Sequence, residues 1–254
     1  MKEDPWARLK GFTPARVALG RSGGSLPTRA LLDFRMAHAL AKDAVHAEFD
    51  AAGLALELES LGCATRLLKS AAAGRAEYLL RPDLGRRLDD ASRELLAESA
   101  GGGVDLVIVV SDGLSATAAS RQVVGVLSEL LPLLEQDGWR LGPVCVVEGG
   151  RVAIQDEIGE LLGARLSLML LGERPGLGSP DSLGAYFTWE PRAGRSDAER
   201  NCVSNIRPEG LVPAAAARRL QALLSNSRRL GLSGIGLKDE TFPALIPADD
   251  HRVE

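Results

Sequence analysis

The chain has few cysteines and few aromatic residues, and both shortages narrow its possible functions. Cys63, Cys145 and Cys202 are its three cysteines, spread across 254 residues. Their odd number and wide spacing argue against a disulfide framework and a Cys-x-x-Cys metal site, and fit a reducing cytoplasm. Aromatic residues make up only 4% of the chain, which argues against surfaces that stack nucleic-acid bases.

Charge and hydropathy exclude two further classes of protein. The net charge of −4 provides no basic field for nucleic acid. No apolar run approaches the roughly 20 residues that cross a bilayer. Residues 1–12 are polar and lack the apolar segment of a secretory signal. We therefore expect a cytoplasmic globular protein that binds neither nucleic acid nor membrane.

The common catalytic and cofactor motifs are also missing. No Gly-x-Gly-x-x-Gly follows the first predicted strand, and the chain has no P-loop, His-Glu-x-x-His or Gly-x-Ser-x-Gly. Its histidines, His38, His46 and His251, are isolated, so packed or solvated roles are favoured over metal binding. We expect neither a catalytic residue nor a metal ligand in this chain.

Strands and helices alternate from residue 104 onward. Residues 104–110 are almost wholly apolar, as a strand buried on both faces must be. Ser115 caps a long helix that Gly138 ends. The further predicted elements are strands at 144–147, 164–171 and 184–189, and helices at 152–162 and 212–230. This order predicts an α/β fold, Rossmann-like and doubly wound, with a mainly parallel sheet.

The part before residue 104 is predicted to be mainly helical. Thr28 caps a helix that runs to about Glu48, and Pro82 opens a second helix over 84–99. Residues 50–80 give no clear pattern. We divide the chain into an N-terminal arm (1–27), a mainly helical region (28–103), a Rossmann-like domain (104–236) and a flexible tail (237–254), with a glycine-rich boundary at 100–103.

Three loops follow the predicted strands, at 111–113, 148–151 and 172–178. Each contains glycine and a charged residue. A single loop of this kind equally fits an ordinary turn. Ligands of open parallel sheets bind at the carboxyl ends of the strands, so three such loops together predict a ligand cleft. Residues 201–205, around Cys202, suit a turn or contact with a polar ligand.

Five segments resemble the small subunits of ethanolamine ammonia-lyase, in the family's order and at similar spacing. They are 13–28, 81–87 (Arg-Pro-Asp-Leu-Gly-Arg-Arg), 111–115 (Ser-Asp-Gly-Leu-Ser), 172–178 (Gly-Glu-Arg-Pro-Gly-Leu-Gly) and 202–206 (Cys-Val-Ser-Asn-Ile). The resemblance covers about residues 5–236. It implies a Rossmann-like subunit that covers adenosylcobalamin at the interface with a large subunit. That (β/α)₈-barrel subunit holds ethanolamine and most catalytic groups, and the hetero-oligomer forms acetaldehyde and ammonia by a radical mechanism.

The resemblance also implies three cofactor-binding residues. Val152 follows Gly-Arg at the start of a helix, Glu173 is the acid of Gly-Glu-Arg-Pro-Gly, and Cys202 is the cysteine of Cys-x-Ser-Asn. The strand-end argument independently favours the neighbourhoods of Val152 and Glu173. The chain has no Asp-x-His-x-x-Gly, in agreement with a cofactor that keeps its own dimethylbenzimidazole as the lower ligand.

Alternatives stay open at this point. The chain could be a self-sufficient nucleotide-binding enzyme, although the missing glycine fingerprint counts against this. It could also be a non-catalytic adaptor that only solubilises its partner. About a dozen residues precede the family-like core. Bacterial-microcompartment packaging, linked in some family members to a long N-terminal extension, is therefore the less favoured localisation.

Overall fold

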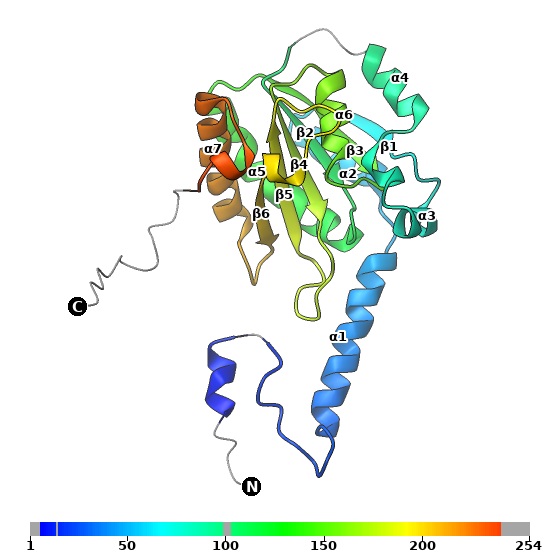
Figure 1. Cartoon of the computed structure of the whole chain (residues 1–254), viewed down its shortest axis with the longest axis vertical. Coiled ribbons are helices and arrows are strands. Elements are labelled where there is room, and N and C mark those ends of the chain that lie inside the picture. The colour runs from blue at the N-terminus through cyan, green and yellow to red at the C-terminus, as the bar shows by residue number, and fades with distance from the viewer. Residues whose placement is uncertain (1–5, 14, 99–102, 240–254) are drawn as a thin grey trace, which may run out of the picture.

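The computed structural model describes residues 6–13, 15–98 and 103–239 and contains one six-stranded sheet between two layers of helices (Figure 1). The strands are β1 (Thr65–Lys69), β2 (Leu106–Ser111), β3 (Leu141–Glu148), β4 (Leu166–Gly172), β5 (Leu183–Trp189) and β6 (Arg200–Ile206). The α-helices are α1 (Thr28–His46), α2 (Ala51–Ser60), α3 (Arg75–Leu80), α4 (Asp90–Glu98), α5 (Ala116–Gln136), α6 (Ile154–Leu161) and α7 (Pro213–Leu230). Short 3₁₀ turns are η1 (Ala7–Gly11), η2 (Leu84–Arg86), η3 (Asp197–Glu199) and η4 (Gly234–Gly236). No helix in these ranges combines the length and hydropathy of a membrane span.

The sheet is mixed, so the prediction of a mainly parallel sheet was wrong. Its order is β1-β3-β2-β4-β5-β6, with β1, β3, β2 and β4 parallel and β5 antiparallel to both of its neighbours. Parallel neighbours need a crossover, and here helices supply it. Only the loops 173–182 and 190–199 join β4 to β5 and β5 to β6, so these strands turn straight back. The α/β class is confirmed, whereas the Rossmann-like, doubly wound description is not.

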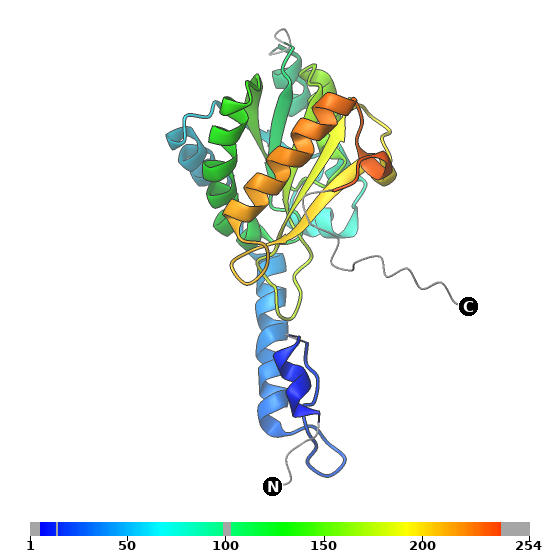
Figure 2. The ribbon, with the colours of Figure 1, turned by 90° about the vertical axis from the view of Figure 1, so that its left-hand side faces the viewer.

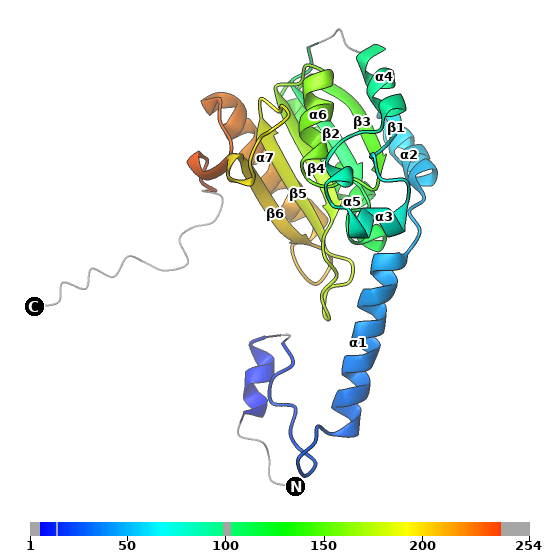
Figure 3. The same ribbon diagram turned by 45° about the vertical axis from the view of Figure 1, so that its right-hand side comes forward.

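Successive side chains of the buried strands point to opposite faces of the sheet, so each face has its own hydrophobic core. In β2, Ile108 and Val110 pack with α2, α5 and α7, whereas Val107 and Val109 pack with α4 and α6. Figure 2 shows α5 and α7 side by side on one face, and Figure 3 brings α6 into view on the other. The fully apolar sequence of β2 follows from this double coverage.

The region before residue 104 contributes a strand as well as helices. β1 pairs with β3 at the edge of the sheet, so the sheet draws on both sides of the predicted boundary. That boundary stays a prediction, and residues 99–102 lie outside the described part. The predicted helix over 84–99 was wrong at its start. Leu88 bridges Ser70, and Asp89 N donates to Lys69 O (3.0 Å), so the chain is extended there and α4 begins only at Asp90.

The structure also differs from the sequence-based predictions near both ends of the chain, at the start of α1 and at Leu237. Thr28 is the first helical residue, and Pro27 occupies the cap position that we predicted for Thr28. The helix α1 then points away from the sheet, and the N-terminal arm runs back beside it (Figure 1). Within the predicted flexible tail, Leu237 is buried and its carbonyl accepts from Asn201 Nδ2 (3.0 Å). Residues 240–254 lie outside the described part.

Candidate functional site

The three predicted loops meet at the carboxyl edge of the sheet. Gly149 N donates to Asp112 Oδ1 (2.8 Å), and Gly150 N donates to Ser111 Oγ (2.8 Å), which joins the first loop to the second. Leu114, the residue after the first loop, donates from its backbone N to the carbonyl of Gly172 (2.9 Å) and so ties the first loop to the third. The prediction that these loops share one edge is confirmed.

Asp112 stabilises this edge from inside the protein. Its carboxylate is buried and receives a 2.7 Å hydrogen bond from Arg75 Nη1, which also donates to the carbonyl of Gly113. Burial raises the pKa of Asp112, although Arg75 and Gly149 N act in the opposite direction. Because its oxygens are already occupied by protein donors, Asp112 holds the loops together rather than facing a ligand.

A cavity of about 800 Å³ opens beside these loops, within the usual size range of ligand sites. Val152, Glu173 and Cys202 all line it. They come from the turn before α6, the loop that follows β4 and strand β6, which are far apart in the sequence. The structure therefore brings together the three residues that the resemblance singled out.

Each of these residues offers the cavity a different group. Glu173 Oε2 accepts from Ser182 Oγ (2.6 Å) and Asn205 N (3.3 Å), and its Oε1 has no donor within the described chain. Cys202 lies opposite Tyr186 in the β5–β6 ladder, rather than in the turn that its neighbours suggested. Partial burial raises the pKa of the Cys202 thiol, so it stays neutral at pH 7 and is a poor nucleophile.

Arg151 and Tyr78 form another part of the wall. The Tyr78 hydroxyl donates to the carbonyl of Gly150 (3.1 Å), and Arg151 Cζ lies 4.2 Å from the centre of the Tyr78 ring. Arg151 Nη2 donates to the carbonyl of Tyr78 (3.2 Å). Its Nε is buried and has no acceptor among the described residues. Such an unpaired donor costs about 1–3 kcal/mol, so a ligand or water oxygen that reached it would stabilise this wall.

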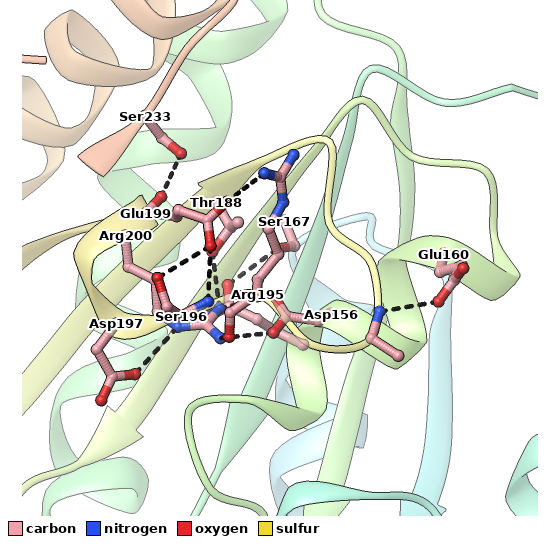
Figure 4. A network of polar contacts seen from close by, with 12 residues as sticks. Asp156, Glu160, Ser167, Thr188, Arg195, Ser196, Asp197, Glu199, Arg200 and Ser233 are labelled. Carbon is pink, nitrogen blue, oxygen red and sulfur yellow. Dashed lines mark hydrogen bonds and ion pairs between the residues drawn. The ribbon is translucent and has the colours of Figure 1, made fainter. Parts of the chain in front are cut away.

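A buried ion pair fixes the remaining wall, and sequence reasoning missed it. Arg200 donates to both oxygens of Asp156 at 2.6 Å and to Thr188 Oγ1 at 2.9 Å (Figure 4). Arg200 also donates to the carbonyl of Arg195 (2.9 Å), and Ala193 N donates to Glu160 Oε2 (3.0 Å), so the loop 190–199 is fastened beside α6. Asp156 and Arg200 are 44 residues apart, and no local pattern links them.

The same loop contains a capping box, a local motif that can be recognised in the sequence. Ser196-Asp-Ala-Glu199 is a capping box, in which the Ser196 backbone and side chain both donate to Glu199 Oε2. These bonds, with the ion pair to Arg195, lower the pKa of Glu199 to about 2. The box presents Ser196 and Asp197 to the cavity.

Comparison with known proteins places the chain in a family. The model of the ethanolamine ammonia-lyase light chain (EutC) matches residues 3–238. This chain belongs to the ethanolamine ammonia-lyase light-chain family. It is 57% identical to the ethanolamine ammonia-lyase small subunit of Pseudomonas paraeruginosa, over 98% of this chain and 93% of that relative. It is 52% identical to the small subunit from Pseudomonas fluorescens, over 98% of this chain and 91% of the relative.

Membership of this light-chain family confirms the resemblance drawn from the five motifs. It does not test the individual contacts. The cofactor-binding roles of Val152, Glu173 and Cys202 therefore stay predictions, although all three line one cavity. Ser182, which donates to Glu173, and the Asp156–Arg200 pair join them as residues that shape the site.

Proposed function

We propose that this chain is the small subunit of an adenosylcobalamin-dependent ethanolamine ammonia-lyase and covers the cofactor in the 800 Å³ cavity. The complex with the large subunit would convert ethanolamine to acetaldehyde and ammonia. The observation that carries the proposal is the meeting of Val152, Glu173 and Cys202 in one cavity of a light-chain family member. Adenosylcobalamin, when bound, supplies the radical that starts the reaction.

The groups in the cavity fit a corrinoid. A corrin ring carries amide side chains around an apolar macrocycle. Glu173 Oε1 is free to accept from such an amide, while Leu114, Val152 and Tyr186 provide apolar contact. A corrinoid is larger than the ligands that cavities of this size usually enclose. One side would therefore stay uncovered for a second chain.

The helix α1 supports the need for a partner. Leu32, Met36 and Leu40 on this helix are between 51% and 63% exposed, and its buried residues are two alanines. Several large apolar side chains on one projecting helix are typical of a protein–protein contact. We infer that α1 packs against the large subunit, which would hold ethanolamine and the catalytic groups. A cytoplasmic location remains part of this proposal.

Acetaldehyde formation from ethanolamine and adenosylcobalamin tests the proposal. The chain would be assayed alone and after co-expression with a candidate large subunit, with the large subunit alone as the control. We expect activity only when both subunits are present. A stable complex that binds cobalamin but forms no acetaldehyde would show that the substrate or the reaction has been misassigned. Full activity of the large subunit alone would favour the adaptor alternative.

A further inference from the structure

The charge of the cavity wall differs from that of the chain. Five arginines but only two carboxylates line the cavity, although the whole chain has a net charge of −4. Arg195 and Arg200 are neutralised by acidic partners. Arg86, Arg151 and Arg174 form no ion pair with any carboxylate in the described ranges. The wall thus presents three arginines without a counter-ion.

Two of these arginines are held next to each other by the backbone. Arg151 N donates to the carbonyl of Gly85 (2.7 Å), the residue before Arg86. Stacking on Tyr78 fixes the Arg151 guanidinium, and its Nη1 donates to no acceptor in the described chain. Arg174 reaches the same cavity from the loop after β4. Arginines from three segments of the chain therefore line the same cavity.

Such an arrangement favours an anionic ligand group. A guanidinium donates two parallel N–H bonds that match the oxygens of a phosphate, and a fixed side chain loses less entropy on binding. We propose that Arg86, Arg151 and Arg174 form a subsite for a phosphate-type anion carried by the ligand of this cavity. The assignment rests on the proposed function, because in a cobalamin this anion is the phosphodiester of the nucleotide loop.

A comparison of two corrinoids tests the subsite in the complex with the large subunit. Cobalamin carries the phosphodiester, whereas cobinamide lacks the nucleotide loop altogether. Equilibrium binding of each would be followed by the absorption of the corrin. We expect Arg151→Gln and Arg174→Gln to weaken cobalamin binding about tenfold, the loss of one charge-assisted hydrogen bond, and to leave cobinamide binding unchanged.

The matched control is Arg87→Gln. It removes the same charge from an exposed residue beside Arg86 that does not line the cavity, and it should change neither affinity. Arg174 is exposed and makes no hydrogen bond within the described chain, so its variant tests the subsite even if Arg151→Gln fails to fold. Equal weakening of both corrinoids, or no weakening of cobalamin, would overturn the subsite. A wild-type complex that binds neither corrinoid would instead refute the proposed function.

Discussion

The ion pair between Arg200 and Asp156 gives the strongest prediction about stability. Both side chains are 3% exposed and share two hydrogen bonds of 2.6 Å. In Arg200→Met, Asp156 would stay buried without its counter-ion, and Thr188 Oγ1 would lose its donor. Breaking a buried pair in this way costs about 3–5 kcal/mol. Because native domains are stable by only about 5–15 kcal/mol, a large share of the stability should be lost.

Urea unfolding of the purified chain at pH 7 measures this loss. With a denaturant slope of about 1–3 kcal/mol/M, the unfolding midpoint should fall by about 1 M or more. The control is Arg121→Met. Its side chain is 64% exposed and its Nη1 lies 3.3 Å from Asp181 Oδ2, so the loss of this ion pair should cost no more than about 1 kcal/mol. Equal midpoints for the two variants would refute the reasoning.

Two further measurements separate an unpaired charge from lost packing. Adding Asp156→Leu to Arg200→Met removes the isolated carboxylate, so part of the stability should return. Burial already raises the pKa of Asp156, and the variant removes the arginine that lowers it. The folded variant therefore takes up a proton at a higher pH than the unfolded chain does. The stability gap to wild type should narrow as the pH falls from 7 toward the ordinary range of carboxyl groups.

Three other substitutions test the site. Glu173→Gln should lower the cobalamin affinity of the complex about tenfold through the lost charge. The midpoint of urea unfolding should not change. An unchanged cobalamin affinity would show that Glu173 does not contact the cofactor. Gly172→Ala should lower the free energy of unfolding in urea by about 1–3 kcal/mol, because the new Cβ would collide with the carbonyl oxygens of Asp112 and Ser115. Gly178→Ala is the control, since a Cβ at Gly178 meets no atom within 4 Å. Glu199→Gln should lower the melting temperature at pH 7. The pKa of Glu199 is about 2 in the folded protein, below that of an ordinary carboxyl group, so the ionised carboxylate stabilises the fold at every pH above the ordinary carboxyl pKa. That stability is lost as the pH falls toward 2, so the difference between the two proteins should shrink there.

Central elements were predictable because their own sequence reflects their burial. β2 is buried along its whole length, and α5 begins at the Ser115 cap, whose oxygen accepts from Ala118 N (3.1 Å). Edge strands lack this signal. β1 and β6 leave several side chains exposed, so their polar residues resemble those of loops. The antiparallel end of the sheet was missed for two reasons: β6 was not recognised as a strand, and the lack of a helix between β4 and β5 was not read as a direct reversal of the chain.

The residues of the candidate site also differ in how far the sequence predicted them. The positions of strand ends and glycines predicted that the loops around Val152 and Glu173 lie at a ligand cleft. This was possible because ligands of open parallel sheets bind at the carboxyl ends of the strands, and those ends can be located from the order of elements along the chain. Cys202 came from the family resemblance alone, since the strand that carries it was read as a turn. The Asp156–Arg200 pair had no signal, because tertiary packing alone brings those two residues together.

The same ion pair connects stability with ligand binding. Arg200 donates to the carbonyl of Arg195, and the loop that it holds presents Ser196 and Asp197 to the cavity. Arg200→Met should therefore weaken cobalamin and cobinamide binding together, since it loosens a wall rather than removing one contact. Glu173→Gln should weaken binding without destabilising the fold. A wall-forming residue and a contact residue are thus distinguished by measuring affinity and unfolding on the same variants, because only the first changes both.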